Sequence, residues 1–197
     1  MREMINMVVV LTLLSAFSGG LLAAVRTGTK DQIEQQVLKF QKAPAIKQIL
    51  SDVSNDPLKD RFKIMDKEEE LTFFVGKHGD KSDVITFETS GKGFGGDIGL
   101  MVGINIESDK IIGVAVTTHS ETPGLGSKAK DDPKFVSQFA GMTMDKNLDI
   151  KKNGGEIDAM SGATVTSAGV ALAAKKAQEI YTRLKPEIQK QATQLAK

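Results

Sequence analysis

The order of hydrophobic and polar residues begins with a long apolar stretch. Residues 4–25 are uncharged and mostly apolar. A helix of about 20 apolar residues crosses the hydrocarbon core of a bilayer, so this stretch is long enough for a transmembrane helix. A cleaved signal peptide is the alternative, but its apolar core would be about 7–15 residues long, and no clear Ala-x-Ala cleavage site follows here. We therefore expect a retained membrane anchor over residues 1–26.

The next segment has the spacing of an amphipathic helix. Apolar residues recur at roughly helical intervals between Gln and Lys residues, at Ile33, Val37, Leu38 and Phe40. Pro44 should end or kink this helix just before it, with a second short helix over residues 45–52. A turn and a boundary are indicated at residues 55–57. Residues 27–60 are therefore predicted to form a juxtamembrane helical connector.

Beyond residue 61 the pattern becomes typical of strands and then of helices. Strand-like runs occupy residues 71–75, 84–87, 100–106 and 111–117, with turns at residues 78–80 and 107–110. Pro133 suits the first turn of a helix. An alanine-rich helix is expected over residues 168–184, and Pro186 should break or kink it. These elements predict an α+β fold: an N-terminal transmembrane helix, then a single domain over residues 61–197 with an antiparallel sheet and packed helices.

Charge and cysteine content narrow the range of functions. The 197 residues include 26 Lys+Arg and 25 Asp+Glu, a net charge of +1. A nucleic-acid surface would show a clustered basic excess, which is absent from this sequence. The chain contains no cysteine, which excludes disulfides and cysteine-ligated metal clusters of its own. The two histidines, His78 and His119, have no persuasive hydrolase context around them, and no metal-ligand cluster is visible.

The segment from Asp158 to Ser167 carries the strongest chemical signal. Gly162 and Ala163 allow the backbone to approach a ligand closely. Hydroxyl groups follow at the start of the alanine-rich helix, where free N–H groups and the helix dipole attract phosphate. A simple helix cap is the alternative. The residues alone do not choose a phosphate acceptor among the four hydroxyl side chains, which are Ser161, Thr164, Thr166 and Ser167.

Two glycine-rich segments precede this one. Residues 91–96 match a bare GxGxxG spacing, but a strand rather than a helix follows, so a dinucleotide site of the Rossmann type is not expected. A bulge or tight bend is the better interpretation. Residues 119–126 include Pro123-Gly124, a strong turn signal. By composition this segment is either a plain strand-to-helix loop or part of a binding site.

The string Asp158-x-x-Ser161-Gly162-Ala163-Thr164 resembles the flavinylation motif of FMN-binding domains. That family includes the G subunit of the Rnf ferredoxin:NAD oxidoreductase and the C subunit of the sodium-translocating NADH:quinone reductase. The resemblance implies FMN attached to Thr164 as a phosphoester. It also implies that a flavin transferase, which takes FMN from FAD with the help of magnesium, reads a pattern that includes Asp158. The neighbouring Ser161, Gly162, Ala163, Thr166 and Ser167 would line the phosphate.

The sequence Glu-Thr-Pro-Gly-Leu-Gly of residues 121–126 is similar to a second motif of this family, which lies against the flavin. Leu125 could supply an apolar face for the ring. Its polar edge could meet Thr122 and the backbone of Gly124 and Gly126. Glu121 would either orient the loop or meet a ring N–H. His119 is expected to be a structural or edge residue rather than a proton donor.

The resemblance implies a function as well as a cofactor. The chain would be an electron-transfer subunit of an Rnf-type ion-translocating oxidoreductase, with no complete active site of its own. Its partners would be other membrane subunits, and it would be a single-pass protein of the cytoplasmic membrane with its soluble domain outside the cytoplasm. Two alternatives remain open: a membrane-anchored FMN-binding sensor or assembly module, and a tethered binding module without redox function.

Overall fold

The computed structural model describes residues 1–79 and 81–195, in two units that comprise residues 1–40 and residues 41–197. Asp80, in the turn predicted at residues 78–80, and residues 196–197 lie outside the described residues. The first unit is the helix α1, Arg2–Val37, followed by the start of a π-helical turn, η1, Leu38–Lys42. Among the described residues one helical run, Arg2–Ile49, is long and apolar enough to cross a membrane.

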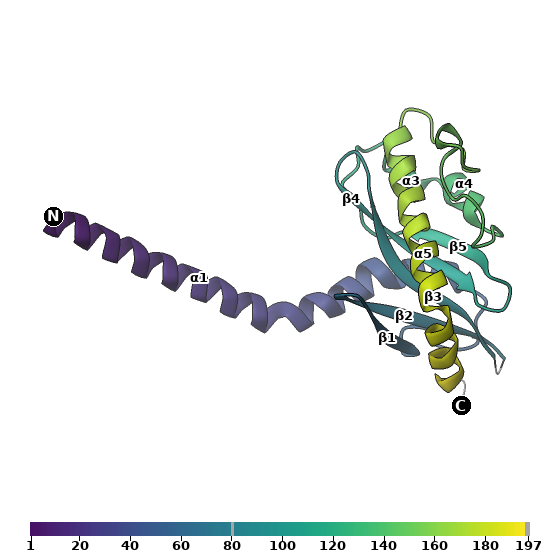
Figure 1. Cartoon of the computed structure of the whole chain (residues 1–197), viewed down its shortest axis with the longest axis horizontal. Helices are drawn as coiled ribbons and strands as arrows, with labels where there is room; N and C mark the ends of the chain where they lie inside the picture. Colours follow the sequence, from purple (N-terminus) through teal and green to yellow (C-terminus); the bar gives the residue numbers. More distant parts are fainter. Residues whose placement is uncertain (80, 196–197) are drawn as a thin grey trace. The chain divides into compact units, whose positions relative to one another are not determined.

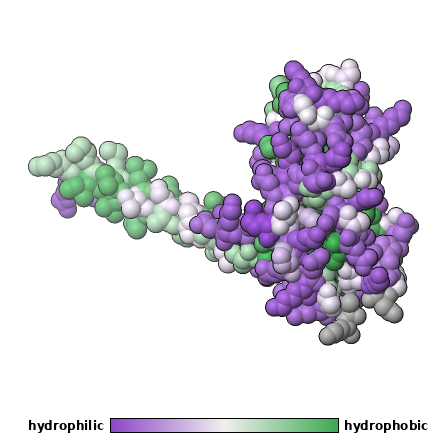
Figure 2. Space-filling view, turned by 45° about the vertical axis from the view of Figure 1, so that its right-hand side comes forward, coloured by the Kyte–Doolittle hydropathy of each residue, from purple (hydrophilic) through white to green (hydrophobic). Residues whose placement is uncertain are grey.

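No residue of α1 is buried. Its N-terminal part presents a hydrophobic surface, whereas the visible face of the second unit is mostly hydrophilic (Figure 2). Within the apolar stretch, the Thr12 hydroxyl donates to the Val8 carbonyl at 2.8 Å, so the helix itself supplies a partner for this polar group. An exposed apolar helix whose backbone groups bond within the helix suits a lipid environment. The structure thus supports the predicted membrane anchor.

The second unit is built on a five-stranded antiparallel sheet in which each strand pairs with the next along the chain (Figure 1). The strands are β1 Arg61–Asp66, β2 Glu69–His78, β3 Lys81–Lys92, β4 Asp97–Asn105 and β5 Lys110–Val116. The predicted α+β class is confirmed. The sequence pattern indicated strands from residue 62 on but assigned no separate strand to β1, a short edge strand of sequence RFKIMD.

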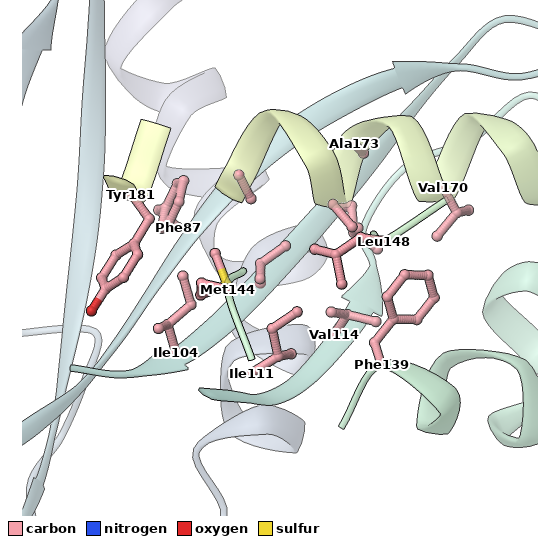
Figure 3. Close-up of a cluster of buried hydrophobic side chains, with 14 of the residues drawn as sticks. Phe87, Ile104, Ile111, Val114, Phe139, Met144, Leu148, Val170, Ala173 and Tyr181 are labelled. Carbon is pink, nitrogen blue, oxygen red and sulfur yellow. The ribbon is translucent and has the colours of Figure 1, made fainter. Parts of the chain in front are cut away.

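The helix α5, Thr164–Leu195, covers one face of the sheet (Figure 1). Its small residues let it lie close to the strands: the Thr89 hydroxyl donates to the Ala173 carbonyl at 2.8 Å. Figure 3 shows Val170, Ala173 and Tyr181 of this helix beside side chains from the sheet and from the segment after it. The labelled partners there are Phe87, Ile104, Ile111, Val114, Phe139, Met144 and Leu148. This core fixes the helix relative to β3 and β4.

A short helix, α2, Ala43–Ile49, packs on the opposite face of the sheet. Successive side chains of a strand alternate between faces, so Glu88 points away from α5, and its carboxylate meets Lys42 Nζ at 2.7 Å. Pro44 lies in the first turn of α2, as expected from the missing N–H of proline. The remaining short helices are α3 Lys128–Asp131, α4 Pro133–Val136, and the 3-10 turns η2 Ser137–Phe139 and η3 Lys151–Asn153.

Two glycines allow α5 to approach β3 at its last residues. A Cβ placed on Gly91 would lie 2.0 Å from the Gly169 carbonyl oxygen, and one placed on Gly169 would lie 2.7 Å from the Lys92 carbonyl oxygen. Both obstacles are backbone atoms, which cannot move aside as a flexible side chain would. The close contact brings the first turns of α5 to the glycine-rich end of β3.

A break or a kink was expected at Pro186, and the structure shows that the helix does not break there. The helix begins at Thr164, earlier than the predicted run, and continues past Pro186 to Leu195. Ile188 and Ala192, both beyond the proline, are fully buried at 0% exposure. Burial of these side chains offsets the backbone hydrogen bond that proline removes, because helices in proteins are stabilised mainly by packing.

Candidate functional site

The start of α5 has the features of an anion-binding site. Ala163 N–H donates to the Met160 carbonyl at 3.1 Å, which closes a tight turn through Gly162 with φ +76°. Among the residues that the structure describes, the N–H groups of Thr164, Val165 and Thr166 have no protein acceptor. Unpaired N–H groups at the positive end of a long helix attract phosphate. The small residues Gly162 and Ala163 thus leave the N-terminal end of α5 accessible to a ligand.

The four hydroxyl groups of residues 158–167 differ in their surroundings. Thr166 is 2% exposed and donates to the Glu121 carboxylate. Ser167 is 0% exposed; it accepts from Met160 N–H and donates to the Ala163 carbonyl, both at 2.9 Å. Ser161 is exposed and Thr164 is half-buried. Only these last two present a hydroxyl that a second protein could reach.

Glu121 joins the three glycine-rich segments. Its side chain is only 6% exposed. One carboxylate oxygen accepts from Gly95 N–H at 2.8 Å, and the other accepts from the Thr166 hydroxyl. Hydrogen bonds to a carboxylate are among the stronger ones in proteins, and they offset the cost of burying it. This geometry supports the loop-orienting alternative for Glu121, since both oxygens already have protein donors.

The glycines around Glu121 provide the space that its carboxylate needs. A Cβ on Gly93 would lie 2.5 Å from Glu121 Oε1, and one on Gly126 would lie 2.6 Å from Oε2. Gly126 is therefore buried beneath the loop rather than at its edge. The backbone N–H of Gly124 donates to Ser127 Oγ at 3.0 Å. Of the residues expected at a flavin edge, Thr122 and Gly124 are exposed and Gly126 is buried.

Apolar side chains are exposed next to the helix start, one on each of the three segments. Phe94 is 76% exposed, Leu125 47% and Val165 53%. A Cβ on Gly162 would touch the Leu125 side chain at 3.5 Å, which places the second motif against the first. Phe94 and Val165 are not among the residues that the sequence motifs suggested for a cofactor site. The available signal for Phe94 was a large aromatic residue among glycines with no strand position to bury it.

Two outer residues complete the site. His119 Nδ1 accepts from the Glu121 N–H at 3.3 Å, so this histidine helps to hold the loop. Asp158 lies on the surface, where its carboxylate meets Lys151 Nζ at 2.8 Å. No group of three or more potential metal ligands lies together within the described part of the chain.

Together these features define a class of protein. The site combines a phosphate-binding helix start, an accessible hydroxyl and exposed apolar side chains. Such a site fits a cofactor that has both a phosphate and a flat, largely apolar ring. The model of the FMN-binding domain family matches residues 93–179, which include all three glycine-rich segments of the site apart from Gly91 and Lys92.

Similarity to individual proteins extends over most of the chain. The G subunit of the ion-translocating oxidoreductase complex of Escherichia coli O157:H7 is 32% identical, covering 91% of each chain. The G subunits of the complexes of Salmonella typhi (32%, 86% of each chain) and Methanosarcina acetivorans (30%, 86% of this chain and 89% of the relative) are similar. The chain therefore belongs to the FMN-binding domain family, in the group formed by the G subunits of ion-translocating oxidoreductase complexes.

A solved structure shares the fold. The crystal structure of Shewanella oneidensis NqrC superimposes with a TM-score of 0.50 at 18% identity, covering 82% of this chain and 98% of that one. At this identity the likeness is one of fold.

The Glu121–Thr166 hydrogen bond predicts different effects for two threonines in the same helical turn. Thr166→Val keeps the shape but leaves a buried carboxylate with one donor fewer, so unfolding free energy should fall by about 2 kcal/mol. Thr164→Val, at a half-buried hydroxyl with no protein partner, should change it by less than about 0.5 kcal/mol. Denaturant unfolding of the two full-length variants in detergent measures both. Equal effects would show that the Glu121 bond contributes little to stability.

Proposed function

We propose that this chain is an electron-transfer subunit of a membrane-bound, Rnf-type ion-translocating oxidoreductase, and that it carries FMN covalently on Thr164. The observation that carries the proposal is the meeting of three segments at one helix start. Glu121 ties the Glu-Thr-Pro-Gly-Leu-Gly loop to Gly95 and Thr166, and Leu125 lies against Gly162. The named relatives are subunits of such a complex.

Burial supports Thr164 as the acceptor. The hydroxyls of Thr166 and Ser167 are buried and already donate to protein oxygens. Thr164 is the first residue of α5, so an ester on its hydroxyl would place the phosphate beside the unpaired N–H groups. Ser161 is equally reachable, and the resemblance of the motif favours Thr164 over it.

Bound FMN supplies the redox chemistry, and the protein supplies its attachment and surroundings. Thr164 would hold the phosphate, and the exposed side chains of Phe94, Leu125 and Val165 would offer apolar contact to the ring. A covalent bond prevents loss of the cofactor from an open site. Outside the cytoplasm, FMN that dissociated would not be replaced from a pool of free FMN, so covalent attachment keeps the protein loaded.

The membrane helix and the relatives support membrane association next to other subunits of a complex. We propose that the FMN-binding domain faces the extracytoplasmic side. The division of the chain into a membrane anchor of residues 1–26, a connector of residues 27–60 and a domain of residues 61–197 is part of the same proposal. The helix α2 within that connector already packs on the sheet, with Ala43, Ala45 and Ile46 buried.

Attachment can be tested by intact mass after co-expression with a flavin transferase. The wild-type chain should gain one FMN phosphoester, and Thr164→Val should gain none because the accepting oxygen is gone. Ser161→Ala removes the other reachable hydroxyl and should keep the modification, as should Thr166→Val with its buried hydroxyl. An FMN adduct on Thr164→Val would assign the ester to another residue.

Electron relay can be tested with the other subunits of a complex. Flavinylated chain mixed with its purified, reduced membrane partners should lose its visible flavin absorbance, since an exposed site lets a partner approach the cofactor. A complex assembled with Thr164→Val should form but turn over at background rate. A flavin that stays oxidised while the complex turns over normally would favour the sensor or assembly module instead.

Sidedness can be tested because the chain contains no cysteine. Lys152→Cys places a single thiol on an exposed position of the domain, and Arg2→Cys places one on the other side of the apolar stretch. In intact cells with a permeable outer layer, a membrane-impermeant maleimide should label Lys152→Cys, whereas Arg2→Cys should react only after lysis. The reverse pattern would put the domain in the cytoplasm.

A further inference from the structure

The backbone of Asp158 is held by one side chain from a different part of the chain. Gln138 Oε1 accepts from Asp158 N–H at 2.8 Å, and Gln138 Nε2 donates to the Asp158 carbonyl at 3.1 Å. The amide thus pairs with both main-chain groups of one residue, as a neighbouring β-strand would. Neither the family match nor the motif assigns a role to Gln138.

Gln138 is itself rigidly placed. It lies in the turn η2, between Phe135 and Phe139, which are 3% and 0% exposed. The two rings meet edge to face, with centroids 6.1 Å apart. The Gln138 amide also donates to the Phe135 carbonyl at 3.4 Å. Since the core holds both flanking phenylalanines, the amide is a fixed support rather than a mobile surface group.

The segment on either side of Asp158 is held as well. Ile157 N–H donates to the Asp149 carbonyl at 3.1 Å, and Met160 N–H donates to Ser167 Oγ at 2.9 Å. The backbone is therefore ordered from Ile157 to the helix start, while the side chains of Asp158 and Ser161 remain exposed. The Lys151–Asp158 ion pair joins side chains that are 59% and 67% exposed. Such an exposed ion pair contributes little free energy, so a partner protein could displace Lys151 and bind the Asp158 carboxylate.

We propose that Gln138 is a positioning residue for flavin attachment: it presents Asp158 in the conformation that the flavin transferase binds. The inference rests on the proposed attachment to Thr164. In that reaction Thr164 Oγ1 forms a bond to the FMN phosphorus of FAD, the pyrophosphate bond breaks, AMP leaves and the hydroxyl proton is released. Gln138 takes no part in these bond changes. It acts by holding the segment around Asp158 in one conformation before binding. Less conformational entropy is then lost when the flavin transferase binds this segment.

The test is transferase kinetics on full-length, unmodified chain in detergent, with purified flavin transferase, FAD and Mg²⁺. Gln138→Met keeps the length of the side chain and removes both hydrogen bonds to Asp158. It should raise the KM for the protein substrate about tenfold, the effect of losing two ordinary hydrogen bonds, with kcat unchanged. Gln138→Asn keeps the polar amide but is too short to reach both groups, and it should show a smaller rise in KM.

Gln178→Met is the matched control. Gln178 Nε2 also donates to backbone carbonyls of a separate segment, including that of Lys146 at 3.0 Å. This variant should lose similar stability but keep the wild-type KM. Hydrogen exchange at the Asp158 amide should quicken only in the Gln138 variants.

The possible outcomes separate the two proposals. A wild-type KM for Gln138→Met, or an equal change in Gln178→Met, would overturn the role of Gln138 while leaving attachment intact. A lower kcat at unchanged KM would also overturn it, because that result places the defect after binding. Wild-type chain that accepts no FMN would overturn both proposals.

Discussion

A buried carboxylate between three backbone segments is the interaction on which the site depends. Glu121 is almost fully removed from water and accepts hydrogen bonds from Gly95 N–H and the Thr166 hydroxyl. A carboxylate in such a position is costly unless donors surround it. The loop of residues 119–126, the connection between β3 and β4, and the first turn of α5 must therefore meet in one arrangement. Any relative shift among them would leave a charge and two donors without partners.

The glycines of the site follow from this arrangement. Gly93 and Gly126 have no room for a Cβ because the Glu121 carboxylate fills that space, and Gly91 has none because α5 crosses it there. The first N–H groups of α5 are unpaired because any α-helix start lacks intrahelical acceptors for them. The close packing of α5 on β3 places this helix start beside the glycine-rich segments.

Much of the site could be predicted because its motifs are local strings. The resemblance of residues 158–164 to a flavinylation motif, and of residues 121–126 to a second motif, identified the family that the relatives then showed. The sheet was predicted in outline from alternating apolar residues. No separate strand was assigned to β1, since its pattern is short and charged. Of the break or kink expected at Pro186, the break does not occur, since burial of Ile188 outweighs the lost hydrogen bond.

Residue types alone could not rank the four hydroxyls of residues 158–167, because serine and threonine offer the same chemistry wherever they lie. Burial distinguishes them: Thr166 and Ser167 are buried and donate to protein oxygens, while Ser161 is exposed and Thr164 is half-buried. In the same way, the two alternatives for Glu121 separate only when its partners on distant segments are seen. The sequence by itself determined the class of domain, the membrane helix and the family, because these depend on local pattern. The tertiary structure decided which hydroxyls are exposed and which are bonded within the protein, because hydrogen-bond partners and exposure depend on contacts between segments far apart in the chain.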